Sequence, residues 1–113
     1  MREFADDTVG ISVHVLCELY YGVELSDDPT GERAQVERLL GSLELVFPGE
    51  SFAHVYGGLD AALTRAGRRI ATMDLLIATS AIEAGATLIT RNLHHFTRVP
   101  GLAVQSYELK RGR

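Results

Sequence analysis

The feature that most constrains the fold is the alternation of short, nearly continuous apolar strands with helical segments. Residues 9–13 are apolar and β-branched enough for a short buried strand, and residues 14–23 directly after them have the pattern of a helix. Further helices are expected at 32–43, 51–66 and 73–84, further strands at 45–47, 86–90 and 102–106, and a turn at 27–31. This alternation predicts an α/β fold with a short, mainly parallel sheet flanked by helices.

Length and composition predict one globular domain. A chain of 113 residues is long enough for one core, so we expect a single domain over residues 1–113. Its single cysteine, Cys17, lies in an apolar stretch and is expected to be a small core residue. No apolar run is long enough for a membrane span or a secretion signal, so a cytoplasmic protein with no membrane partner is expected.

Charge is distributed unevenly along the chain. Residues 1–57 carry eleven acids and three bases, whereas residues 58–113 carry four acids and eight bases. The bases of the second half are candidates for contact with a phosphate backbone: Arg65, Arg68, Arg69, Arg91, Arg98, Lys110, Arg111 and Arg113. The alternative is scattered arginines on solvated helix faces, so charge alone permits nucleic-acid binding without indicating it.

Glu18 is the first candidate site residue. In a helix over residues 14–23 it falls at the edge of the buried face, where a carboxylate is partly removed from water. Gly22, one turn later, leaves open space beside it. The alternative is a carboxylate that reaches solvent or pairs with an arginine.

Asp74 is the second candidate. It is expected to share one face of the helix at 73–84 with Ala78, Ala81 and Ile82, which places an acid on the buried side of the first turn. The positions expected to face outward are Thr79, Ser80 and Glu83. The alternative is a helix cap or a favourable interaction between the charge and the helix dipole.

Asn92 is the third candidate, because it follows the strand at 86–90 and would lie at the carboxyl edge of the sheet, where ligand sites collect. The alternative is an Asx turn or a helix N-cap. His94 and His95 lack the spacing of zinc ligands. Two carboxylates and an amide would form an oxygen-rich site that suits Mg²⁺ or Mn²⁺, and metal-assisted phosphodiester hydrolysis is the chemistry such a site favours.

Three ordered motifs stand out. They are Ile11-Ser12-Val13 running into Glu18-Leu19-Tyr20-Tyr21-Gly22, then Asp74-Leu75-Leu76-Ile77-Ala78, then Leu88-Ile89-Thr90-Arg91-Asn92 with Phe96 and Val99-Pro100-Gly101-Leu102. Together they resemble the PIN domains, and within that family the VapC-type toxins of toxin–antitoxin pairs. By this resemblance Glu18 and Asp74 match metal-binding acids, and Asn92 matches a position held by Asp or Asn. His95 falls where many members have another acid.

The resemblance implies a PIN-like three-layer fold and an endoribonuclease that cleaves RNA with Mg²⁺, or Mn²⁺ in its place. It also implies a VapB-like antitoxin partner and a homodimer. The chain departs from the family at its start, because PIN domains begin with a central strand ending in an Asp-Thr-Asn-like motif, and Asp6-Asp7-Thr8 is only a superficial echo of it. We therefore expect a first strand that is missing, an N-terminally truncated domain, weak metal binding and little or no nuclease activity.

Two other functions stay open from the sequence. The first is a catalytically inactive antitoxin-binding protein, a decoy or remnant that binds antitoxin without cutting RNA. The second sets the resemblance aside and leaves a small α/β binding module of unknown ligand. Neither the RNA target nor the cognate antitoxin is specified by the sequence.

Overall fold

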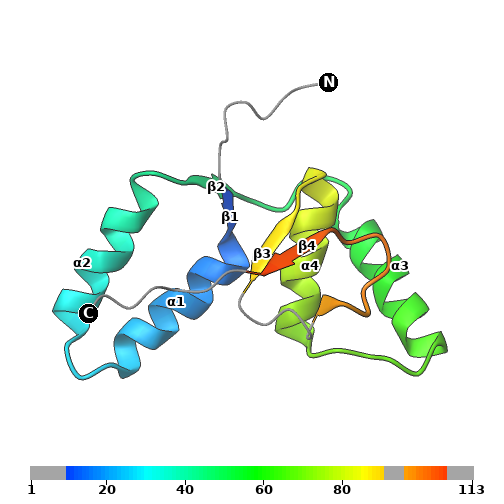
Figure 1. The fold of residues 1–113 in the computed structure, drawn as a ribbon, viewed down its shortest axis with the longest axis horizontal. Coiled ribbons are helices and arrows are strands. Elements are labelled where there is room, and N and C mark those ends of the chain that lie inside the picture. The colour runs from blue at the N-terminus through cyan, green and yellow to red at the C-terminus, as the bar shows by residue number, and fades with distance from the viewer. Residues whose placement is uncertain (1–9, 91–95, 107–113) are drawn as a thin grey trace. The chain divides into compact units, whose positions relative to one another are not determined.

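The computed structural model describes residues 10–90 and 96–106 and contains both helices and strands (Figure 1). The chain divides into two compact units, residues 1–47 and residues 48–113, and each unit is described by itself. Every described strand pair is parallel, so the predicted α/β class with a parallel sheet is confirmed. The expectation of a single domain over residues 1–113 stays a prediction.

The described part of unit 1, from residue 10, has a strand at each end and two helices between them. Its elements are β1 (Gly10–Ser12), α1 (Val13–Leu25), α2 (Pro29–Leu40) and β2 (Glu44–Val46). β1 pairs with β2 with Ile11 opposite Leu45. Ser12 ends β1 and also caps α1, because its hydroxyl accepts a hydrogen bond from the Val15 N–H at 3.2 Å. The strand therefore passes directly into the helix that carries Glu18.

The second helix of unit 1 begins three residues earlier than predicted and ends three residues earlier. The Asp28 carboxylate accepts a hydrogen bond from the Gly31 N–H at 3.1 Å, and Pro29 occupies the first helical position. Proline suits that position because its missing N–H would have no partner in the helix. Helices α1 and α2 pack on each other, and the buried apolar residues of this unit are Ile11, Val23 and Val36.

In its described residues, unit 2 contains the two packed helices α3 and α4, followed by a pair of strands. Its elements are α3 (Phe52–Arg65), α4 (Thr72–Ala84), β3 (Leu88–Thr90) and β4 (Val104–Ser106). β3 and β4 are parallel, with Leu88 opposite Val104. The buried apolar side chains of this unit are Leu63, Leu75, Ile77, Ala78, Phe96 and Val99.

Helices α3 and α4 end at the glycines that the sequence predicts. Gly67, just past α3, has φ of 69°, and Gly85, just past α4, has φ of 67°. A Cβ atom in this left-handed region costs about 1–2 kcal/mol, which explains why glycine stands there. Among the described residues, no helix has the length and apolar character that a membrane crossing requires.

Candidate functional site

Asp74 lies in the first turn of α4, as the sequence predicts. It is partly buried, and the next residue, Leu75, is only 2% exposed. The helix begins after Ala71, which has an extended backbone and makes no side-chain capping bond. A carboxylate in this first turn is stabilised by the positive end of the helix dipole. Asp74 is thus an acid at the start of a buried helix, directly before a core residue of unit 2.

The predicted outward face of α4 is wrong at two positions. Thr79 is 0% exposed and Ser80 is 6% exposed, although both are expected from helical spacing to face solvent. The Thr79 hydroxyl donates to the Leu75 carbonyl at 2.7 Å, so its polar group is satisfied inside the core. Because α4 is buried on several sides, a single apolar face read from helical spacing does not describe it.

Glu18 lies on α1 in unit 1 and is exposed, so the expected partial desolvation of its carboxylate is wrong. Cys17 beside it is also exposed, which corrects its expected place in the core. The open space predicted at Gly22 is confirmed, since a Cβ atom there would meet nothing within 4 Å. Helix α1 buries only Val23 fully, and Glu18 is among its exposed residues.

The three predicted ligands belong to different parts of the chain. Glu18 is in unit 1 and Asp74 is in unit 2, and each position is established within its own unit. Asn92 lies outside the described residues, as do His94 and His95. Within residues 10–90 and 96–106, no three His, Cys, Asp or Glu side chains gather closely enough to hold a metal ion.

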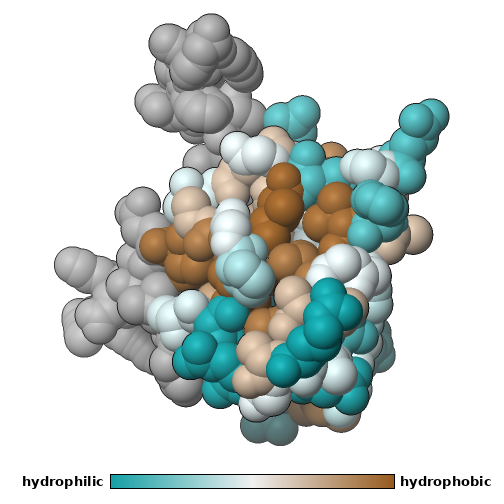
Figure 2. All heavy atoms as spheres, turned by 90° about the vertical axis from the view of Figure 1, so that its right-hand side faces the viewer, coloured by the Kyte–Doolittle hydropathy of each residue, from teal (hydrophilic) through white to brown (hydrophobic). Residues whose placement is uncertain are grey.

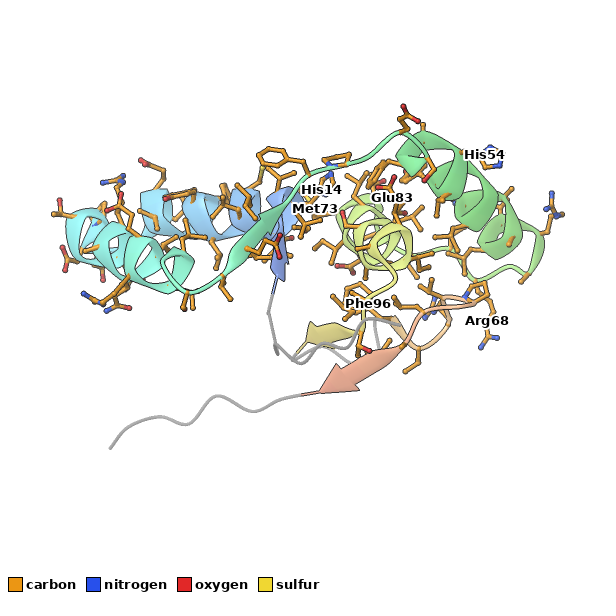
Figure 3. The ribbon with its side chains drawn as sticks, turned by 90° about the horizontal axis from the view of Figure 1, so that it is seen from above. His14, His54, Arg68, Met73, Glu83 and Phe96 are labelled. Atoms are coloured by element: carbon orange, nitrogen blue, oxygen red, sulfur yellow. The ribbon has the colours of Figure 1, made fainter. Side chains whose placement is uncertain are left out.

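Glu83 is a carboxylate with a structural role, which sequence reasoning missed by assigning it to an outward face (Figure 3). One of its oxygens accepts from the Gly49 N–H at 2.9 Å, and the other accepts from the Ser51 N–H at 3.2 Å and the Ser51 hydroxyl at 2.9 Å. The Gly49 bond is the main cause that lowers the pKa of Glu83, the Ser51 bonds add to it, and desolvation opposes it. No local pattern signals a contact between residues this far apart in sequence.

The contact ties the last turn of α4 to the segment just before α3. Ser51 precedes α3, and its side chain does not cap that helix but donates its hydroxyl to the carboxylate of Glu83, which also accepts from the Ser51 N–H. The contact therefore fixes where α3 begins relative to the last turn of α4.

Comparison with known proteins identifies the family. The model of the PIN domain matches residues 1–102. The chain is 35% identical over 103 residues to Ribonuclease VapC2 of Rickettsia felis, which covers 91% of this chain and 77% of that protein. It is 34% identical over 97 residues to the tRNA(fMet)-specific endonuclease VapC of Salmonella typhimurium, covering 86% of this chain and 74% of that protein.

Solved structures give the same answer. The crystal structure of VapBC2 from Rickettsia felis bound to a promoter DNA fragment matches with a TM-score of 0.85 and 36% identity, over 89% of this chain and 76% of that one. DNA-bound VapBC from Salmonella typhimurium matches with a TM-score of 0.83 and 33% identity, over 91% of this chain and 80% of that one. The predicted PIN-like α/β fold is therefore confirmed.

Proposed function

Since the chain belongs to the PIN-domain family, and within it to the VapC group, we propose that it is a ribonuclease toxin of a toxin–antitoxin system. It hydrolyses RNA phosphodiester bonds with the help of Mg²⁺ or Mn²⁺, acts in the cytoplasm and forms a homodimer. The observation that carries the proposal is Asp74 in the first turn of the buried helix α4, within a chain that matches ribonucleases over nine tenths of its length.

The proposed ligands are Asp74, Glu18 and Asn92. Carboxylate and amide oxygens are the donors that Mg²⁺ and Mn²⁺ prefer, so the chemistry of this set fits a hard divalent cation. When bound, such a cation lowers the pKa of a water molecule and offsets negative charge on the phosphorus oxygens. Helix α4 orients the Asp74 carboxylate, and the exposed carboxylate of Glu18 is open to substrate.

We expect cleavage by this chain to be weak. Two carboxylates and a neutral amide supply only two negative charges, and hard cations bind more tightly as the number of charged ligands rises. Impaired activity stays a prediction that the cleavage assay checks directly.

The test is cleavage of a fluorescent single-stranded RNA by the purified chain with Mn²⁺, with and without EDTA. We expect slow cleavage that EDTA abolishes. We expect Asp74→Asn to lower the cleavage rate by more than about 100-fold, because metal assistance is worth several kcal/mol. Glu50→Gln is the matched control, since Glu50 is an exposed acid of the same unit and makes no described bond. Cleavage that Asp74→Asn leaves intact would refute the proposed site.

Antitoxin binding without cleavage is the second candidate. It is favoured by the matched structures, which are VapBC complexes rather than isolated toxins. If a VapB-like antitoxin is bound equally by the chain, by Asp74→Ala and in the presence of EDTA, while no RNA is cut, this second function replaces the first.

A further inference from the structure

All the arginine and lysine residues that the structure describes in unit 2 lie around the connection between α3 and α4. They are Arg65, Arg68, Arg69 and Arg98, and all are exposed. No acidic residue occurs from position 61 to position 73. Figure 2 looks onto the α3 side and shows strongly hydrophilic side chains gathered toward its lower end, where α3 finishes and the connection to α4 runs. We call these four residues the arginine cluster.

Arg98 holds the two segments of the arginine cluster together. Its Nη1 donates to the main-chain carbonyl of Arg69 at 3.1 Å and to that of Arg68 at 3.5 Å. Phe96 and Val99, on either side of Arg98 in the sequence, are buried. Figure 3 shows Arg68 just beyond α3, beside the segment that carries Phe96. The backbone of the connection is therefore anchored to the core of unit 2.

The chain direction at the end of α3 is also fixed. Gly67 has φ of 69°, and the Arg68 N–H donates to the Leu63 carbonyl at 2.8 Å, which is the geometry of a glycine-terminated helix. Leu63 is 2% exposed. Arg65 in the last turn and Arg68 just after the glycine are thus held on a short, ordered stretch of backbone.

The four charges are not equally available. Arg69 forms an ion pair with Asp60 at 3.6 Å, and the Nη1 of Arg98 donates hydrogen bonds to main-chain carbonyl oxygens. Arg65 and Arg68 have no carboxylate partner among the described residues. The dipole of α3 attracts a cation with only about half a charge at its end, so it does not neutralise two guanidinium groups. Guanidinium donors match phosphate oxygens in a two-pronged geometry.

We propose that Arg65 and Arg68, which are not among the proposed metal ligands, bind the phosphodiester backbone of single-stranded RNA. The inference rests on the proposed function, and it adds a substrate-positioning surface to it. Arg68 precedes Asp74 by six residues, so their Cα atoms are at most about 22 Å apart. A strand of a few nucleotides spans that distance. Because phosphate contacts carry no sequence information, this surface orients RNA without selecting its sequence.

The test is binding of a fluorescent single-stranded RNA of about a dozen nucleotides by the full chain in EDTA, measured by anisotropy between about 50 and 200 mM salt. EDTA prevents cleavage and separates binding from catalysis. Each phosphate contact on single-stranded nucleic acid contributes about 0.7 to the slope of log K against log salt. The double variant Arg65→Ala/Arg68→Ala is therefore expected to lower the magnitude of the slope by about 1.4.

Two controls separate a charge contact from a structural role. Arg65→Lys/Arg68→Lys keeps both charges and is expected to retain the slope of the unmodified chain. Arg33→Ala removes an arginine of unit 1 that pairs with Glu24 at 2.8 Å, and it is expected to leave the slope unchanged. Circular dichroism melting verifies that every variant is folded.

An unchanged slope in the alanine pair overturns the inference, and so does an equal loss in the lysine pair. If Asp74-dependent cleavage persists while the alanine pair binds RNA like the unmodified chain, the proposed function stands and only this surface is refuted. If the unmodified chain neither binds nor cuts RNA, both fall.

Discussion

Replacing Leu75 by alanine removes a core side chain directly beside Asp74. Leu75 is 2% exposed, so the change takes its three outer carbon atoms out of a fully buried setting. At about 0.8 kcal/mol per buried methylene, the lost transfer free energy is about 2.4 kcal/mol. The cavity left behind adds to this, and leucine-to-alanine changes in cores cost about 2–5 kcal/mol in total. We expect a loss of about 3 kcal/mol in the free energy of unfolding, a large share of the roughly 5–15 kcal/mol that proteins typically have.

Urea unfolding followed by far-UV circular dichroism measures this loss. Where two transitions are resolved, the transition of unit 2 is the one expected to shift. Leu25→Ala is the matched control, because Leu25 is 68% exposed in the last turn of α1 and its removal is expected to change stability by less than about 0.5 kcal/mol. A cost below about 1 kcal/mol for Leu75→Ala, or a cost equal to that of Leu25→Ala, would refute the assignment of Leu75 to the core.

Two other predictions concern Glu83 and the glycines. Glu83→Gln is expected to lower the melting temperature above pH 4.5, the ordinary pKa of the carboxyl, because the ionised carboxylate stabilises the fold. The difference in melting temperature between the variant and the unmodified chain should shrink as the pH falls through the lowered pKa of Glu83, where the carboxylate becomes protonated. A difference that does not change with pH contradicts this. Gly85→Ala, at φ of 67°, is expected to lower the free energy of unfolding in urea by about 1–2 kcal/mol. Gly57→Ala is expected to raise it by about 0.5–1 kcal/mol, because Gly57 lies inside α3 and a Cβ atom there meets nothing within 4 Å. Equal effects of the two changes would contradict the left-handed end of α4 at Gly85.

The order of helices and strands is predictable because its signals are local. The apolar runs predict every strand of the described residues to within two residues at its start, and Gly67 and Gly85 mark two helix ends. The start of α2 is missed although a local signal exists. Asp28 followed by Pro29 is an N-cap and a first helical residue, but the same residues also suit the turn predicted at 27–31.

The errors about burial have a tertiary cause. Thr79 and Ser80 are expected from helical spacing to face solvent, yet both are buried, and a backbone carbonyl satisfies the Thr79 hydroxyl. Cys17 is expected in the core because its neighbours are apolar, yet helix α1 exposes it. Helical spacing relates residues to one another but does not say how many neighbouring elements surround a helix.

The candidate site is predictable in part. The motif at Asp74 places an acid at the start of a helix, and the structure has it there. The helix and open space around Glu18 are also predicted, but its exposure is not. The bonds of Glu83 to Gly49 and Ser51 depend on packing between distant segments, which periodicity in one helix does not report.

The burial of α4 has a consequence for how the protein opens. Five residues of α4 are buried, against one in each of the other described helices. Amide hydrogens exchange with solvent where local opening is cheap, and segments with many buried contacts open only with the whole cooperative unit. The amides of residues 75–80 are therefore expected to exchange last within unit 2, so that the helical turns directly after Asp74 stay formed until the unit as a whole unfolds.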